Sequence, residues 1–339
     1  MPVPPAAEYQ IVAVTDPYGC NTHPLTGLTH FGSNGPTTGI VSVYRRPLPS
    51  TNLGFLTTVM WDGREPTLTQ QSIDATLTHA QGNAVPTAAQ QQQIVGFESG
   101  IFTAQIFDNS ARDLTAAGAN GGPDALASLL SGFFIGINDP LGGQSRKPAI
   151  HVANPRPVPG MERSSRTRQG KRGPRGDSTR RGPFQQRAHH HYRRGGDQRL
   201  AGPASVSGSC GTCHDTPDVG NHSVKLPINI GVANGGHDND NLGLDISDLP
   251  VFTLACVSGP NAGKTYTVTD PGRALISGKC ADVGKLKGPI LRGVAARAPY
   301  FHNGSAATLQ DAVNFYNLRF NIGFTVAQMQ DLTAFLQSL

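Results

Sequence analysis

The sequence predicts a mainly α-helical fold with long loops, and three observations lead to this prediction. Helical patterning occurs in several separate segments, whereas strand signal is weak apart from extended pieces such as 264–269. Glycine and proline are abundant, with 41 and 26 of 339 residues, which is typical of long connections. The chain is also long enough to form two domains and a sizeable core.

The first half is expected to contain three helices after a stretch of other structure. Residues 1–60 are predicted to form loops and short extended pieces. A helix is predicted to begin near Pro66, a favourable first-turn residue, and to continue to about residue 80. A second helix is expected over 87–105 and a third from Pro123.

Two more helices are predicted at the C-terminal end. Thr308 is the expected N-cap of the first, which carries apolar residues on one face at helical spacing. Thr325 and Gln328 have the spacing of a capping box for the second. The apolar face of this last helix consists of Met329, Leu332 and Leu336.

Residues 144–205 differ from the rest of the chain in charge. They contain 15 of the 28 basic residues and 3 of the 23 acidic ones, so the remainder has 28 − 15 = 13 basic and 23 − 3 = 20 acidic residues. The remainder therefore has a net charge of −7. The basic segment has only two aromatic residues, Phe184 and Tyr192, among its 15 basic ones, and its composition predicts no fold to present them, which argues against a nucleic-acid partner.

Two interpretations of 144–205 remain open. As written, the segment has few aliphatic residues and no periodicity, which predicts a disordered basic linker that docks an acidic redox partner. The other hypothesis is a shift of the translation frame, since permitted codons for 189–203 give an apolar, glycine-containing string one nucleotide out of frame. A missing helix in this segment would then leave the apolar face of the last helix exposed.

The segment CGTCH (210–214) carries the strongest chemical signal. Two thiols on one helical turn can add to both vinyl groups of one haem, and the adjacent histidine then reaches the iron. A redox dithiol and half of a zinc site are the alternatives. We predict one haem c on Cys210 and Cys213, with His214 as an iron ligand, in a class I cytochrome c-like domain.

The other cysteines indicate the compartment. Cys256 and Cys280 bracket a short Gly/Pro-containing stretch, and we predict a disulfide, with two buried thiols as the alternative. Cys20 has no obvious partner. Haem c and a disulfide both favour a periplasmic location, although the first residues show no export signal. No apolar run is long enough for a membrane span.

Two longer motifs resemble one protein family. GPILRGVAARAPYFHNGSAATLQDAVNFYN (288–317) resembles the C-terminal signature of the bacterial di-haem cytochrome c peroxidases, including their MauG-like branch. WDGREPTL (61–68) resembles the N-terminal WDGR motif of that family. The resemblance covers about 7–143 and 206–339. It implies a peroxidase-like oxidoreductase with one peroxidatic and one electron-relaying haem, hydrogen peroxide as substrate and a small redox protein as electron donor.

The resemblance also implies roles for single residues near the haem. Trp61 matches the tryptophan that lies between the two haems. Tyr316 falls fourteen residues after His302 of PYFH, at the position of the second axial ligand of the iron. His302 and Met329 are alternative ligands, and an open position is a further alternative. An anionic phenolate oxygen would favour Fe(III) and lower the reduction potential.

The resemblance also bears on a catalytic acid, a calcium site and a first haem motif. The acidic catalytic residue of the peroxidatic site falls on Gln81, which cannot act as a general acid. A calcium site between the domains would use the backbone carbonyls of Arg297 and Pro299. No second C-x-x-C-H motif is present, since CNTH (20–23) lacks its second cysteine. We therefore expect the chain to begin inside the first domain of the family.

These observations predict three parts and one function. Residues 1–143 would form a partial cytochrome-like helical domain without its haem motif, 144–205 the basic segment, and 206–339 the C-terminal cytochrome c domain. The expected function is haem-based electron transfer within the peroxidase-like family. The alternatives are a simple carrier with one haem and no catalysis, and a non-functional truncated product.

Overall fold

The computed structural model describes part of the chain. The described residues are 6–21, 31–32, 35–36, 41–56, 58–104, 106–108, 112–113, 124, 127, 189–190, 207–208, 210, 214, 227–236, 242–337 and 339. Cys213, nearly all of the basic segment and most of the helix predicted from Pro123 lie outside these residues.

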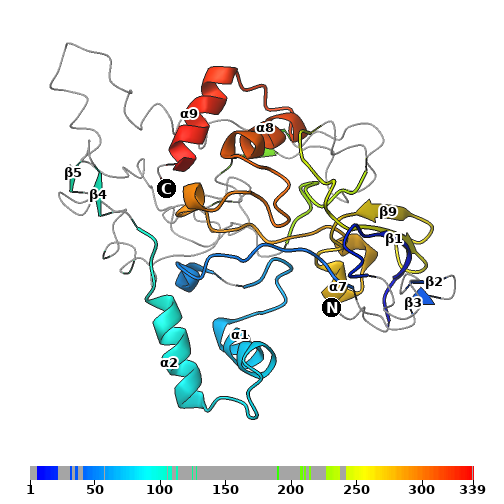
Figure 1. Ribbon diagram of the computed structural model, residues 1–339, viewed down its shortest axis with the longest axis horizontal. Helices are drawn as coiled ribbons and strands as arrows, with labels where there is room; N and C mark the ends of the chain where they lie inside the picture. The colour runs from blue at the N-terminus through cyan, green and yellow to red at the C-terminus, as the bar shows by residue number, and fades with distance from the viewer. Residues whose placement is uncertain are drawn as a thin grey trace.

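A three-stranded antiparallel sheet lies at one end of the molecule (Figure 1). Its order is β1 (Tyr9–Thr15), β8 (Val251–Cys256) and β9 (Thr265–Val268), so a strand near the N-terminus pairs with two strands far along the chain. Alternate residues of β8 are buried, which is typical of a sheet with one face on a core. Strand β9 was expected from the extended piece 264–269, and β1 lies in the stretch 1–60 that was predicted to contain short extended pieces, whereas β8 was not predicted.

The buried face of this sheet covers the first core of the molecule. Phe252 and Leu254 of β8 are fully buried and pack with residues of α7 (Ala274–Ser277). The predicted disulfide is confirmed: Cys256 at the end of β8 is bonded to Cys280 in the 3₁₀ turn η4 (Cys280–Asp282), with 6.1 Å between their Cα atoms. The bond ties the sheet to the chain that leads toward the C-terminal helices.

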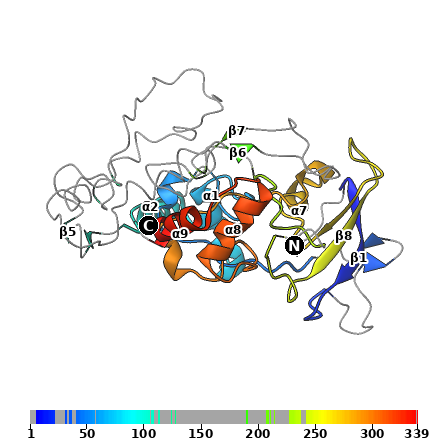
Figure 2. The ribbon, with the colours of Figure 1, turned by 90° about the horizontal axis from the view of Figure 1, so that it is seen from above.

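The C-terminal helices α8 (Leu309–Arg319) and α9 (Val326–Gln337) pack against each other. Both predicted caps are confirmed, since Thr308 and Asp311 form a capping box for α8, and Thr325 exchanges hydrogen bonds with Gln328 before α9. Figure 2 shows this pair beside the sheet.

The expectation that the apolar face of α9 would be exposed is wrong. Leu332 is 5% exposed, and it packs with Val313 of α8 and with Phe324 of the connecting loop. Met329 and Leu336 are partly buried against the same cluster. Residues of α8 and of the loop between the two C-terminal helices therefore bury this face, which a helix within 144–205 was expected to bury.

The helices of the first half lie on the opposite side of the molecule from α8 and α9 (Figure 1). α1 (Leu68–Asp74) begins after the N-cap Thr67 and continues into one π-helical turn, η2 (Ala75–His79). α2 (Ala88–Ser99) begins after Thr87 and buries none of its side chains. It ends at residue 99, before the predicted 105, with Gly100 as its C-cap.

The prediction of a mainly α fold is therefore confirmed only in part. The described residues contain five helices of the α type but also the β1–β8–β9 sheet. The remaining elements are short: η1 (Leu53–Phe55), η5 (Val294–Ala296), and the strand pairs β2 (Phe31–Gly32) with β3 (Gly35–Pro36), β4 (Phe107–Asp108) with β5 (Arg112–Asp113), and β6 (His189–His190) with β7 (Ser207–Gly208). Among the helices described here, none has the length and apolar character that crossing a membrane requires.

Candidate functional site

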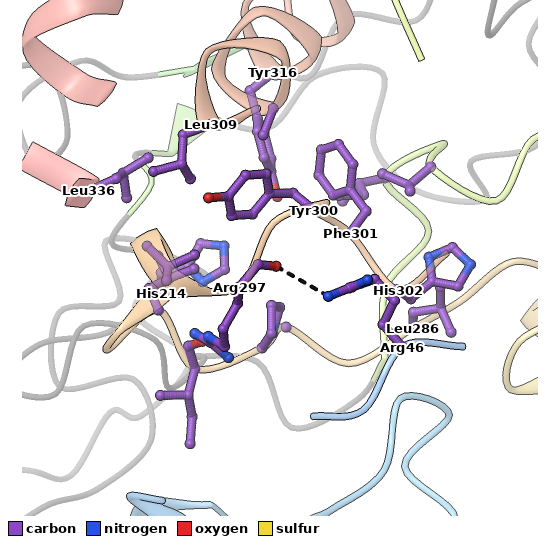
Figure 3. A pocket seen from close by; sticks show the side chains of 18 of the residues that line it. Arg46, His214, Leu286, Arg297, Tyr300, Phe301, His302, Leu309, Tyr316 and Leu336 are labelled. Atoms are coloured by element: carbon purple, nitrogen blue, oxygen red, sulfur yellow. Dashed lines mark hydrogen bonds between the residues drawn. The ribbon is translucent and has the colours of Figure 1, made fainter. Parts of the chain in front are cut away.

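A cavity of about 500 Å³ lies between the α8–α9 pair and the chain around residues 46–49 and 284–302. Most of its lining is apolar, with contributions from Leu309, Val313 and Leu336 of the two helices. Figure 3 shows His214 on one side of this pocket and His302 on the other, with Tyr300 and Tyr316 between them. The volume is in the range of cofactor and ligand pockets.

The predicted haem-attachment segment borders this cavity. Cys210 and His214 both line it, and the backbone N–H of His214 donates to the Cys210 carbonyl over 2.9 Å, as expected for one helical turn. Cys213, the other predicted attachment residue, lies outside the described residues. The described part of the segment therefore has the helical geometry that the motif requires.

The His214 ring has the properties of a metal ligand. Its Nδ1 is buried, and no hydrogen-bond partner for it is found among the described residues. Burial lowers the pKa of His214 to about 4, the charge of Lys287 acts in the same direction, and the Pro289 carbonyl opposes the shift. That carbonyl is near the ring, yet no hydrogen bond of ordinary geometry joins it to Nδ1. The imidazole is consequently neutral at pH 7, the form that binds metal ions.

Tyr316 enters the cavity from α8, as Figure 3 shows. Its ring is stacked on Phe320 with 5.8 Å between centroids, and it meets Phe315 edge to face at 5.5 Å. These rings fix the orientation of the phenol relative to the helix. Tyr300 also lines the cavity, and the sequence analysis did not identify it.

Trp61 and His302 form one corner of the pocket. Their ring centroids are 6.1 Å apart in an edge-to-face arrangement, and the Trp61 indole N–H donates to the Arg46 carbonyl over 2.7 Å. Both side chains line the cavity. The residue matched to a bridge between two haems therefore borders the same cavity as His214.

Behind this corner lies a buried network of charges. Arg45 donates to Asp62 over 2.5 Å and to Asp270 over 2.6 Å, and both carboxylates are at most 1% exposed. His302 Nε2 lies 3.6 Å from Asp270, too far for a hydrogen bond. Burial lowers the pKa of His302 to about 4, despite the opposing charge of Asp270. We therefore treat His302 as neutral, because Arg45 already balances the Asp270 carboxylate.

Gln81 lies apart from the cavity. It follows the π-helical turn η2, its side chain is exposed, and its φ of 52° is in the left-handed region. It is absent from the described lining of the pocket. The structure therefore does not bring the position matched to a catalytic acid together with the residues around His214.

One of the two carbonyls that were matched to a calcium site, that of Arg297, accepts a hydrogen bond from Arg46, as does the neighbouring carbonyl of Ala298. The Arg46 guanidinium donates to the Arg297 carbonyl over 3.5 Å, as Figure 3 shows, and to the Ala298 carbonyl over 3.2 Å. Pro299 lines the same pocket. Calcium binds six to eight oxygen atoms, commonly including carboxylates, and the described residues contain no group of three or more such metal-binding side chains. This arrangement does not fit calcium.

The same cavity does fit haem c. It is mostly apolar, it is bordered by the Cys210 thiol and by two neutral histidines, and its charged lining residues, Arg46, Lys287 and Arg297, are all basic. Among the lining residues that the structure describes there is no Asp or Glu. A flat apolar ligand with two carboxylate groups matches this combination of surface and charge.

Comparisons with known proteins find partial matches to cytochrome c-like proteins. A family model described as RoxA-like, cytochrome c-like matches residues 286–320. The cytochrome c551 peroxidase of Nitrosomonas europaea is 34% identical over 99 residues, which cover 25% of this chain and 30% of that protein. The cytochrome c peroxidase Ccp of Escherichia coli K12 is 41% identical over 75 residues, or 22% of this chain and 16% of that protein.

These matches are partial. The matched part of the chain spans less than a third of the length of either peroxidase. A crystal structure described as a MauG-like protein associated with microbial copper homeostasis matches 91% of this chain and 76% of its own, with 17% identity and a TM-score of 0.42.

Proposed function

We propose that this chain is a haem c protein that transfers electrons and that it is related to the di-haem cytochrome c peroxidases and MauG-like proteins, since the partial matches to cytochrome c peroxidases and to a cytochrome c-like family model support this function. Cys210 and Cys213 would attach the haem, and His214 and Tyr316 would ligate its iron. The observation that carries the proposal is that Cys210, His214 and Tyr316 border one buried apolar cavity. Haem c, when bound, supplies a one-electron couple between Fe(III) and Fe(II).

The residues of this chain control the environment of that couple. The apolar side chains of α8 and α9 keep water away from the cavity, which lowers the local dielectric constant. The basic lining residues offset the two carboxylates of the group. The phenol of Tyr316 would provide a hard anionic oxygen, which favours the oxidised iron and lowers the reduction potential.

Trp61 is the proposed route for electrons at the edge of the pocket. Its ring contacts His302 and its indole N–H is held by the Arg46 carbonyl, so its position is fixed relative to the cavity. A small redox protein is the proposed electron donor. A second haem at this edge, which the resemblance to di-haem peroxidases implies, would make Trp61 a bridge between two redox centres.

Peroxidase activity is the second candidate function, with hydrogen peroxide as the substrate. The sequence relationship to cytochrome c peroxidases favours it. Gln81 disfavours it, because its exposed amide cannot transfer the protons that cleavage of an O–O bond requires. We expect no turnover of peroxide with a reduced donor by this chain alone.

A periplasmic location is part of the proposal. The Cys256–Cys280 disulfide requires an oxidising compartment to persist. Covalent haem attachment takes place outside the cytoplasmic membrane, so both features call for the same compartment.

The decisive experiment is a haem stain of the denatured protein. The chain is produced with an export leader in a host that attaches haem c, and the stained band should persist after boiling in detergent. The double variant Cys210→Ala/Cys213→Ala should lose the stain, whereas Cys20→Ala, which changes an exposed cysteine outside the pocket, should keep it. An unstained wild-type band at full expression would refute the proposal.

A further inference from the structure

Arg46 places a positive charge directly against a backbone turn that borders the haem pocket. One guanidinium nitrogen faces two consecutive carbonyls, those of Arg297 and Ala298, at 3.5 and 3.2 Å. Figure 3 shows the side chain reaching across the pocket toward Arg297. Outward-facing carbonyl oxygens of this kind attract cations, and a guanidinium is a permanent one.

The backbone of Arg46 is held on both sides, so the guanidinium is delivered to this turn by a fixed segment. The Arg46 N–H donates to the His302 carbonyl over 2.6 Å. The Arg46 carbonyl accepts the indole N–H of Trp61 over 2.7 Å. Arg46 thereby connects three chain segments, around residues 46, 61 and 297–302, at one edge of the cavity.

The charges around Arg46 disfavour an additional divalent ion. Lys287 and Arg297 also line the pocket, and the described lining contains no carboxylate. The nearby acids Asp62 and Asp270 are already paired with Arg45. A calcium ion at the Arg297 and Ala298 carbonyls would therefore find no carboxylate ligand in the described lining of the pocket, and it would be repelled by the Arg46 guanidinium that already contacts both oxygens.

We propose that the Arg46 guanidinium is a built-in cation that takes the place of calcium at this turn. It links the turn at 297–299 to the segment that carries Trp61 and holds the edge of the pocket without a bound metal ion. The proposal concerns the same pocket as the proposed function but makes a separate claim, because calcium content can be measured whether or not haem is attached.

The first test measures calcium in the haem-loaded protein. The protein is equilibrated with calcium, passed through a desalting column, and analysed by atomic emission before and after treatment with a chelator. We expect no stoichiometric calcium. We also expect no change in the Soret band or the thermal midpoint when calcium is added to about 10⁻³ M, where weak extracellular sites fill. One calcium per chain, whose removal changes either signal, would overturn the proposal.

The second test uses variants of Arg46. Arg46→Met removes the charge but keeps an unbranched stem, so it should lower the thermal midpoint and shift the Soret band. Arg46→Lys keeps the charge and should lie closer to wild type. The matched control is Arg273→Met, because Arg273 also donates to two carbonyls, those of Asp62 and Gly63, without lining the pocket.

The control separates general stability from the effect on the pocket. Arg273→Met should lower the thermal midpoint and leave the Soret band unchanged. If Arg46→Met leaves both signals at their wild-type values, or if it behaves as Arg273→Met does, the proposal is wrong. If no variant and no wild-type protein carries haem, the proposed function fails, and the calcium measurement on the haem-free chain still decides this inference.

Discussion

Two tyrosines bring phenol groups to the same cavity from different parts of the chain. Tyr316 lies on α8, and Tyr300 lies in the loop before it. Replacing Tyr316 with Phe keeps the ring that packs on Phe320 and removes only the hydroxyl. If its oxygen ligates iron, Tyr316→Phe should raise the reduction potential and abolish the phenolate bands in a resonance Raman spectrum.

Tyr300→Phe is the matched control for this prediction, and it should keep the phenolate bands. Loss of the bands in Tyr300→Phe but not in Tyr316→Phe would assign the ligand to Tyr300. Bands that persist in both variants would show that neither phenol binds the iron.

Arg45 balances two buried carboxylates at once. Asp62 is 0% exposed and Asp270 is 1% exposed, so removal of the guanidinium leaves charge that water cannot reach. Arg45→Met should lower the free energy of unfolding by about 3–5 kcal/mol. Arg64 also contacts Asp62, but its side chain is 33% exposed, and Arg64→Met should cost less than about 1 kcal/mol. Chemical denaturation measures both variants. If Arg45→Met and Arg64→Met lose equal free energies of unfolding, Arg45 is not the main partner of the buried carboxylates.

His302 gives the protein a predictable dependence on pH. Burial and the charge of Arg45 lower its pKa to about 4, against the attraction of Asp270. The unfolded chain binds the proton below about pH 6.5, whereas the folded chain does not until about pH 4. The free energy of unfolding is therefore highest above pH 6.5 and decreases as the pH falls toward 4, by about 3 kcal/mol from this residue.

Thermal unfolding at a series of pH values measures this dependence. His302→Gln cannot take up the proton, so its thermal midpoint should change less than that of wild type between pH 6.5 and 4. The burial of Asp270 would raise its pKa, but Arg45 outweighs burial and lowers it, so Asp270 adds a further loss only at lower pH. Parallel curves for wild type and variant would exclude His302 as the source.

At the scale of whole elements, the C-terminal helices could be predicted because their signals are local. Thr308, Thr325 and Gln328 mark the helix starts within a few residues of sequence: Thr308 caps α8 as predicted, and Thr325 exchanges hydrogen bonds with Gln328, its predicted partner. The π-helical turn at 75–79 carries no such signal. Strand β8 did carry one, since Phe252, Leu254 and Cys256 alternate with less buried residues, and period-two analysis of 251–256 could have found it.

What covers an apolar face depends on contacts that local patterns do not encode. The apolar face of α9 was predicted to be exposed because a helix within 144–205 was expected to pack on it. In the structure Val313 and Phe324, from the residues that adjoin α9, pack on it instead. The ion pairs of Arg45 also cannot be predicted from local patterns, since Asp270 is separated from Arg45 by 225 positions. Trp61 and His214 could therefore be predicted from the sequence, whereas the residues that position them could not.

Leu332 tests how much the α8–α9 contact contributes. It is 5% exposed in the cluster with Val313 and Phe335, so Leu332→Ala should lower the free energy of unfolding by about 2–5 kcal/mol. Leu318 of α8 is 39% exposed, and Leu318→Ala should change it by no more than about 0.5 kcal/mol. Denaturant titration compares the two, and similar losses would show that α9 is not packed as described.

At the scale of the whole molecule, the N-terminal segment belongs to the same sheet as the chain near the haem pocket. Tyr9 pairs with Cys256 of β8, and its hydroxyl donates to the Ala274 carbonyl over 3.0 Å. The Cys280 N–H donates to the Glu8 carboxylate over 2.9 Å. The predicted boundaries at 143 and 206 remain a prediction, but this pairing means that a break between them separates β1 from its partner strands.

The fragment 206–339 tests this consequence. It retains β8, β9, the disulfide and the C-terminal helices, but it lacks β1. Tyr9 and Ile11 are 3% and 1% exposed, and their burial is worth roughly 3–6 kcal/mol together. The fragment should therefore unfold at a lower temperature than the full chain, and a synthetic peptide of residues 6–18 should raise its thermal midpoint by binding along β8.

A peptide with Tyr9→Ser and Ile11→Ser should have no effect, because it offers the same backbone without the buried side chains. If the fragment melts at the temperature of the full chain and neither peptide changes it, β1 is not required, and 206–339 is a domain that folds by itself.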